Sequence, residues 1–325
     1  MRFLILMLIL IVDLEGDFMK KIVFMGTPLY SVPVLDMLNK NYDVVLVVTQ
    51  PDKEVGRKRV LTPCPCKSYA LEHGIDVFSP FKIKEDYERI LSYEPDLIVT
   101  CAYGQIIPSE VIYAPLYDTI NVHASLLPKY RGGAPIHRAI MNGDKETGVT
   151  IMYTDPGMDT GDIITSRSVP ILDNDTYDII SSKLSVLGAE LLSSVLPLVF
   201  SGEVTREVQG DDYSIARIIK REDEHIDFNM DSVLVHNKIR GLSSVPCAYA
   251  NLDGKPVKII LSSLEGCLFT DKDYGMVTRT SKDGIFVSCK DKEIKITKIQ
   301  VSGKKPVLVK DYLNGAGNIV GKRFE

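Results

Sequence analysis

Short, almost uninterrupted apolar runs constrain the fold of this chain more than any other feature. Five of them lie in the first 122 residues, at 21–25, 44–49, 75–78, 97–102 and 119–122. Segments with the apolar spacing of helices, such as 29–38 and 84–91, separate them. Continuous apolar strands are typical of parallel sheets, because helices cover both faces of such sheets. We therefore predict an α/β domain with a Rossmann-like, mostly parallel sheet flanked by helices.

The C-terminal part of the chain has a different pattern. After a long amphipathic helix at 184–200 and a second helix at 231–242, short strands recur with turn signals such as Asp253-Gly254 between them. They are expected at 248–252, 257–262, 275–280, 284–288 and 293–301. This spacing predicts a small, OB-like β-barrel, a fold that often binds oligonucleotides. A β-domain that serves only for packing is the alternative.

These patterns divide the chain into four segments. Residues 19–207 form the first domain, 208–224 a polar linker and 225–325 the barrel domain. Residues 1–18 are expected to be a non-native extension, with Met19 as the start of the protein. Their apolar run at 3–12 is too short for a membrane-spanning helix, and Asp13, Glu15 and Asp17 stand where a signal peptide would carry small neutral residues.

Charge and cysteine usage exclude little but indicate the compartment. The net charge of −5 is no signature of a nucleic-acid-binding protein, although residues 222–325 hold 16 Lys and Arg against 14 Asp and Glu, which leaves −7 on the rest. A solvated lysine-rich surface explains that small excess as well as an anionic partner does. The six cysteines have no zinc-site spacing and are expected to be free thiols in a reducing cytoplasm. We expect no metal site.

Two common nucleotide motifs are missing from the sequence. No GxGxxG follows the first strand, where a single Gly26 precedes Thr27-Pro28, and no GxxxxGK[ST] occurs anywhere. The fold class alone would suit an NAD enzyme, but the missing glycines exclude that interpretation.

Chemically competent side chains gather in residues 119–163. Asn121 and His123 stand two residues apart at the end of a strand, so both side chains point to one face. Asp159 lies in a glycine-bounded loop after the next strand. The alternatives are a structural histidine and an ordinary acidic turn, and His137 on a helix is the competing imidazole.

The three groups suit acyl transfer to an amine. Attack of an amine on an acyl carbon creates an oxyanion, to which the Asn121 amide and the His123 imidazole can donate. Asp159 beside the imidazole would hold its tautomer. No Ser or Cys is placed as a covalent nucleophile with this histidine, so direct transfer is favoured.

Several motifs together resemble those of the methionyl-tRNA formyltransferase family of bacteria and organelles. In chain order they are FMGTP, QPD with GR, CAYGQIIP, NVHASLLPKYRGGAPI, GDKETGVTIM and GMDTGDI. The resemblance covers the chain from about Met19 to its end. One departure is Ser244-Val245-Pro246, where many relatives carry Asn-Pro-Trp-Pro.

The resemblance implies roles for individual residues. Asn121, His123 and Asp159 would be the catalytic trio. The folate would contact Ser125, Leu126, Leu127 and Pro128, with the pterin near Cys101, Ala102, Tyr103 and Gly104 and near Asp155. A basic loop of Arg57, Lys58 and Arg59 would contact tRNA phosphates; a solvated basic turn is the plainer interpretation.

The resemblance also implies an activity and its partners. The chain is expected to be a cytoplasmic, monomeric enzyme, without a membrane partner, that formylates methionine on initiator Met-tRNA with 10-formyltetrahydrofolate. Another folate-dependent N-formyltransferase, acting on glycinamide ribonucleotide or a sugar amine, is the nearest alternative. A tRNA-binding protein with an inactive formyltransferase domain is the alternative from another class.

Overall fold

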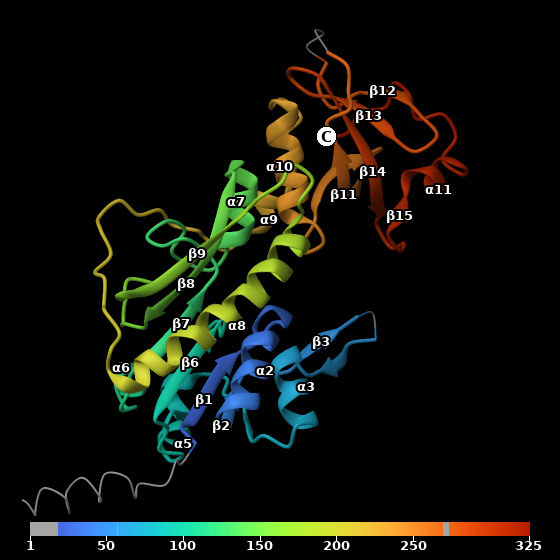
Figure 1. The fold of residues 1–325 in the computed structure, drawn as a ribbon. Coiled ribbons are helices and arrows are strands. Elements are labelled where there is room, and N and C mark those ends of the chain that lie inside the picture. Colours follow the sequence, from blue (N-terminus) through green and yellow to red (C-terminus); the bar gives the residue numbers. More distant parts are fainter. Residues whose placement is uncertain (1–18, 57, 269–272) are drawn as a thin grey trace, which may run out of the picture. The chain divides into compact units, whose positions relative to one another are not determined.

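The computed structural model of this chain describes residues 19–56, 58–268 and 273–325 (Figure 1). The predicted extension at 1–18 and the predicted tRNA contact Arg57 lie outside these residues. The chain divides into two compact units. Of the described residues, unit 1 comprises those up to Val122 together with Met152–Gly157 and Leu192–Thr205, and unit 2 comprises those within His123–Ile151, Met158–Leu191 and Arg206–Glu325.

Parallel strands form the centre of unit 1. They are β1 (Lys21–Gly26), β2 (Asp43–Val48), β5 (Val77–Phe78), β6 (Leu97–Cys101) and β7 (Thr119–His123), whose last residue is counted with unit 2. Their order is β5-β2-β1-β6-β7, and each neighbouring pair is parallel. β6 is buried along its whole length, because its five residues face other elements on both sides. The predicted parallel sheet is confirmed.

Helices and one hairpin complete unit 1. The helices are η1 (Leu29–Ser31), α2 (Val32–Asn41), α3 (Pro65–Glu72), α4 (Ile83–Asp86), α5 (Glu88–Leu91) and α6 (Ser109–Ile112). α2 packs against β1, β2 and α3. The single helix expected at 84–91 is therefore two short helices, which meet at Tyr87. The exposed hairpin of β3 (Lys53–Val55) and β4 (Val60–Thr62) was not predicted.

Gly26 lets the ends of β1 and β6 approach each other closely. A Cβ atom at this position would lie 2.6 Å from the Phe24 ring and 2.9 Å from the Cys101 carbonyl oxygen. Both neighbours belong to buried strands that cannot move aside. The FMGTP motif thus brings two loops together at the carboxyl edge of the sheet.

Unit 2 contains one whole strand and most of a second from the predicted first domain; the last two residues of the second, Met152 and Tyr153, are counted with unit 1. β9 (Ile163–Pro170) follows β8 (Glu146–Tyr153), and the two are neighbours in their sheet. α7 (Pro135–Asn142) packs against α10 (Ser232–Leu242). α10 also packs against strands of the barrel, so one helix joins the predicted catalytic and barrel segments. The predicted domain boundaries stay a prediction.

The C-terminal strands close into a barrel. They are β10 (Ala248–Leu252), β11 (Lys255–Ser263), β12 (Val277–Thr280), β13 (Ile285–Ser288), β14 (Glu293–Val301) and β15 (Val307–Leu308), with α9 (Arg221–Glu224) before them and α11 (Val309–Leu313) after them. Their order is β10-β11-β14-β13-β12, with β15 beside β14. This confirms the predicted small β-barrel.

The last five residues complete the barrel by pairing with both of its edge strands, β10 and β12. Glu325 exchanges backbone hydrogen bonds with Asn251 of β10, at 2.6 and 2.8 Å. The Val277 amide of β12 donates to the Lys322 carbonyl at 2.8 Å, and Phe324 is buried in the barrel core. Closure removes the unpaired strand edges that would otherwise pair with other chains.

The long helix α8 (Tyr177–Ser201) begins seven residues before the predicted start at 184. By length and composition it is apolar enough to cross a membrane, and 56% of its apolar window is buried inside the protein. Core helices satisfy the same criterion, so this is weak evidence for a membrane span.

Candidate active site

Asn121 is oriented by a hydrogen bond from the neighbouring strand. Thr100 on β6 is the register partner of Asn121 on β7, and the Thr100 hydroxyl donates to the Asn121 Oδ1 at 2.9 Å. Because Oδ1 accepts this bond, Nδ2 is the donor end of the amide. Thr100 was not predicted as a site residue, although it stands directly opposite Asn121 in a parallel sheet. Its hydroxyl gives the amide one defined orientation.

His123 ends β7 with both ring nitrogens facing acceptors. The side chain is buried, with the residue only 6% exposed. Nε2 lies 3.0 Å from the Tyr130 carbonyl oxygen, and Nδ1 lies 3.6 Å from Asp159 Oδ1. A neutral imidazole carries one N–H, so only the doubly protonated ring can donate toward both oxygens. The pair joins two residues that are 36 positions apart in the sequence.

Asp159 is held in a constrained loop between β8 and β9. Its φ angle is +54°, in the left-handed region that residues with a Cβ atom rarely adopt. The Gly132 amide donates to Asp159 Oδ2 at 2.8 Å. Gly132 has a φ of +116°, and a Cβ atom there would lie 2.9 Å from the Ala216 carbonyl oxygen. The glycine of the YRGGAP motif is therefore needed for this contact.

The predicted folate loop after His123 is ordered by its own hydrogen bonds. The Ser125 hydroxyl donates to the Lys129 carbonyl at 2.6 Å, and Ser125 is fully buried. Thr150 of β8 donates to the Ser125 carbonyl and accepts from the Leu127 amide. Leu127 is buried, whereas Leu126 and Pro128 are half-buried.

A second predicted folate loop follows β6 in unit 1. Ala102 and Gly104 have positive φ angles, so the chain turns sharply after Cys101. Ala102 and Gly104 are exposed, and the Tyr103 carbonyl accepts from Thr27 and Gln50 side chains. Burial raises the pKa of the Cys101 thiol to about 12, so it stays protonated near neutral pH and is no nucleophile. Asp155, also in unit 1, accepts a hydrogen bond from the Gly157 amide.

Two of the three residues of the predicted basic loop are described, and they lie in the turn of the β3–β4 hairpin. Lys58 and Arg59 are exposed there, and Arg59 lies 3.7 Å from Glu54 on the same hairpin. Within the described ranges, no group of three or more His, Cys, Asp or Glu side chains is arranged to hold a metal ion. All six cysteines belong to these ranges and are free.

Residues from the predicted linker also surround the Asp159 loop. Gln209 donates to the carbonyls of Asp159 and Gly161, and its Oε1 accepts from Arg131. A polar glutamine between two domains carried no signal of this in the sequence. The contact needed the folded chain to reveal it.

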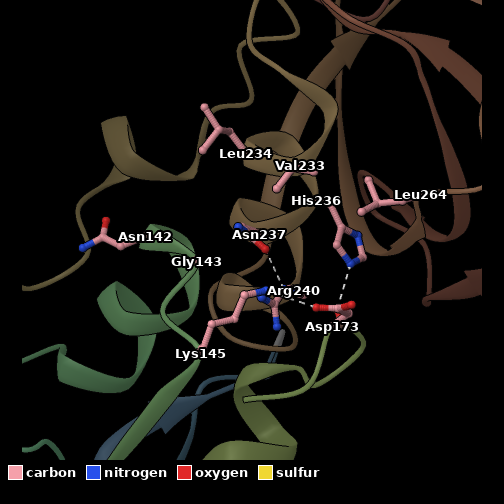
Figure 2. A pocket seen from close by; sticks show the side chains of 10 residues that line it. All are labelled: Asn142, Gly143, Lys145, Asp173, Val233, Leu234, His236, Asn237, Arg240 and Leu264. Carbon is pink, nitrogen blue, oxygen red and sulfur yellow. Dashed lines mark hydrogen bonds and ion pairs between the residues drawn. The ribbon is translucent and has the colours of Figure 1, made fainter. Parts of the chain in front are cut away.

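A pocket of about 430 Å³ lies elsewhere in unit 2, lined by α10 and the loops after α7 and β9. Figure 2 shows His236 and Arg240 of α10 pointing toward Asp173. His236 Nε2 lies 3.1 Å from the Asp173 carbonyl and Nδ1 lies 2.9 Å from the Ser262 hydroxyl. The neutral ring satisfies both contacts, donating from Nε2 and accepting at Nδ1. None of the predicted site residues lines this pocket.

The buried state of His236 predicts how stability depends on pH. Burial, followed by the nearby Arg240 charge, lowers the pKa of His236 below its ordinary value, although the Asp173 contacts oppose this. In the unfolded chain the imidazole takes up a proton below a pH of about 6.5, whereas the folded chain resists it. Stability is therefore lost as the pH falls from that value toward the folded-state pKa.

We expect the urea midpoint of unfolding to fall between pH 7.5 and 5.5, and His236→Gln to reduce this fall. The exposed His73 supplies the control, since His73→Gln should leave the pH dependence unchanged. The half-buried His137, whose pKa is also lowered by burial, accounts for a remaining pH dependence of the same sign. An unaltered pH dependence in His236→Gln would contradict the assignment.

Comparisons with known proteins agree with this geometry. The formyl transferase family model matches residues 19–196, and the model of the formyl transferase C-terminal domain matches residues 218–317. A methionyl-tRNA formyltransferase of Macrococcus caseolyticus is 47% identical over 94% of this chain and 99% of its own length. One from Staphylococcus aureus is 46% identical over 94% of this chain and its full length.

Solved structures share the fold at lower identity. HypX from Aquifex aeolicus, in complex with tetrahydrofolic acid, has a TM-score of 0.64 at 18% identity, covering 92% of this chain and 47% of HypX. The sugar 3N-formyl transferase WlaRD has a TM-score of 0.60 at 22% identity, covering 89% of this chain and all of WlaRD.

Proposed function

The chain belongs to the formyl transferase family and, within it, to the methionyl-tRNA formyltransferases; we propose that it transfers the formyl group of 10-formyltetrahydrofolate to the α-amino group of methionine on initiator Met-tRNA. The observation that carries the proposal is the similarity to relatives of that name along nearly their whole length. The paired His123 and Asp159 supply chemistry that suits this reaction.

We propose direct transfer through a tetrahedral intermediate. The amine nitrogen bonds to the formyl carbon while the carbonyl oxygen becomes an oxyanion, and the bond from that carbon to N10 of the folate then breaks. The amine loses one proton and N10 gains one, so the exchange balances without an added acid. An α-amine has a pKa near 8, so part of it is already neutral at pH 7.

Each member of the trio has a proposed part in these steps. Asn121 Nδ2 donates to the oxyanion, because Thr100 holds the other end of the amide. His123 Nε2 would exchange its contact with the Tyr130 carbonyl for the substrate, where it would donate to the same oxygen or carry the proton between the amine and N10. Asp159 pairs with the imidazolium form of His123, at 3.6 Å between Oδ1 and Nδ1.

Binding roles follow from the loops at the carboxyl edge. We propose that the folate contacts Ser125, Leu126, Leu127 and Pro128, with its pterin near Cys101–Gly104 and Asp155. Ligands of open α/β sheets bind outside the carboxyl ends of the strands, which is where β6 and β7 end. Arg57, Lys58 and Arg59 are proposed to contact phosphates of the tRNA acceptor end.

The C-terminal barrel is proposed as the second tRNA contact. Small closed barrels of this kind commonly bind oligonucleotides. We further propose that the enzyme acts as a monomer in the cytoplasm, without a membrane partner. Its only co-substrate would then be the folate, with no metal held by the protein.

A direct assay tests the activity. The chain from Met19 to Glu325 is supplied with 10-formyltetrahydrofolate and, separately, with initiator Met-tRNA, elongator Met-tRNA and an amino sugar nucleotide. We expect formylmethionine on initiator tRNA and little product from the other two. Formylation of the sugar alone would instead support a sugar N-formyltransferase, and tRNA binding without any transfer would indicate an inactive tRNA-binding protein.

A further inference from the structure

Residues 207–216, here called the bracing segment, pair with both loops that carry the proposed catalytic residues of unit 2. At one end Glu207 and Ile163 exchange backbone hydrogen bonds of 2.8 and 2.9 Å, immediately after the Asp159 loop. At the other end the Arg131 amide donates to the Ser214 carbonyl, and the Ala216 amide donates to the Arg131 carbonyl. The segment therefore connects the Asp159 loop to the loop that follows His123.

Gln209 uses its whole amide group within this arrangement. Nε2 donates to the Asp159 carbonyl at 3.0 Å and to the Gly161 carbonyl at 2.7 Å. Oε1 accepts from Arg131 Nε at 2.9 Å. Both N–H groups and the oxygen thus have partners on the two loops.

Arg131, which donates to Gln209, is itself held in place by its surroundings. It is 7% exposed, and its guanidinium lies 4.6 Å from the centre of the Tyr213 ring, which belongs to the bracing segment. The next residue, Gly132, donates its amide to the Asp159 carboxylate. Gln209 and Gly132 therefore hold the same aspartate from two segments that meet at Arg131, Gln209 through the backbone carbonyl and Gly132 through the side chain.

The backbone of Asp159 needs such support. Its left-handed φ of +54° is unfavourable for a residue with a Cβ atom, so surrounding contacts must maintain it. If the Asp159 carbonyl loses its donor, the loop can relax toward ordinary φ values. The carboxylate would then turn away from His123 Nδ1.

We propose that Gln209 is a positioning residue, which holds Asp159 in the orientation that pairs with His123 during formyl transfer. The proposal rests on the proposed function, since it concerns the rate of that reaction. Gln209 is not assigned any contact with a substrate. It acts through the backbone of Asp159.

Two substitutions distinguish this positioning role from an alternative in which Gln209 only accepts a hydrogen bond from Arg131. Gln209→Ala removes all three bonds, whereas Gln209→Glu keeps an acceptor for Arg131 but loses both donors. Single-turnover rates should fall about 10- to 100-fold for both variants, because a misplacement of about 1 Å can cost that much. KM for the folate and for tRNA should stay within about twofold of the parent enzyme, as expected for loss of an interaction made in the transition state.

Val208→Ala is the matched control, because Val208 neighbours Gln209 and its side chain is 79% exposed. Its rate should equal that of the parent enzyme. If Gln209→Glu retained full activity while Gln209→Ala did not, the glutamine would only anchor Arg131, and the proposal would be wrong.

A double-mutant cycle decides whether Gln209 acts through Asp159. In an Asp159→Asn background, Gln209→Ala should lower the rate by less than about twofold, because coupled residues are not additive. A general loss of folded protein would lower the rate equally in both backgrounds and would overturn the proposal. An inactive parent enzyme would refute the proposed function instead, so the two failures are distinguishable.

Discussion

His123→Ala is expected to lower kcat for formyl transfer to initiator Met-tRNA by about 10³-fold or more, the upper range for loss of a general acid–base group. The imidazole is buried at the end of β7, with Asp159 and the Tyr130 carbonyl on its two nitrogens. No other imidazole shares this position among the described residues, since His137 stacks on Tyr177 with its Nε2 facing the Val245 carbonyl. Formylation measured with saturating folate and tRNA gives kcat directly.

The same variant should bind tRNA nearly as tightly as the parent enzyme. The proposed tRNA contacts are on the β3–β4 hairpin and the barrel, and His123 is not one of them. Filter binding of labelled initiator tRNA measures this affinity. His73→Ala serves as the matched control, because His73 is exposed at the C-terminal cap of α3. This substitution should change neither kcat nor the affinity for tRNA. Substantial activity in His123→Ala would show that the trio is wrongly assigned.

Asp159→Asn is expected to lower kcat by about 10²–10³-fold with little change in either KM, as for the loss of a preorganised polar group at a reacting centre. Asparagine has the same shape, and its oxygen can still accept from the Gly132 amide. The amide NH₂ that replaces Oδ1 cannot pair with the imidazolium and would meet Nδ1 as a donor. The loss is therefore electrostatic, and protein stability should change little.

Asp162→Asn is the matched control for this substitution. Asp162 lies in the same loop between β8 and β9, and no catalytic role is proposed for it. Circular dichroism melts of both variants separate a folding defect from a catalytic one. Equal rates for Asp159→Asn and Asp162→Asn would remove Asp159 from the mechanism.

Elements with a strong apolar signal were predicted well. β6, β10 and β14 lie at or within one residue of their expected bounds, because their apolar runs are bounded by turn residues. The β3–β4 hairpin was missed, since its strands are only three residues long and all six residues are exposed, so that no buried face gives an alternating pattern. The barrel was predicted, but the part of the C-terminal residues in closing it was not, because residue 325 pairs with residue 251 and such long-range pairing leaves no local pattern.

The residues of the site can likewise be divided into those that the sequence predicted and those that it did not. Asn121 and His123 could be placed together from the sequence, because strand alternation puts residues two apart on one face. Thr100, Gly132 and Gln209 could not, since each contributes through a partner that is distant in the sequence. Their hydrogen bonds depend on strand register and on loops meeting in space.

Local sequence patterns were enough to predict the two kinds of fold, the strand that carries Asn121 and His123, and the family to which the motifs point. These follow from local periodicity and from residue types at fixed spacing. The pairing of Asp159 with His123, and the hydrogen bonds from the predicted linker to the Asp159 loop, became visible only in the folded chain. Both are contacts between segments far apart in the chain, where the energy of packing and hydrogen bonding, rather than local preference, selects the partner.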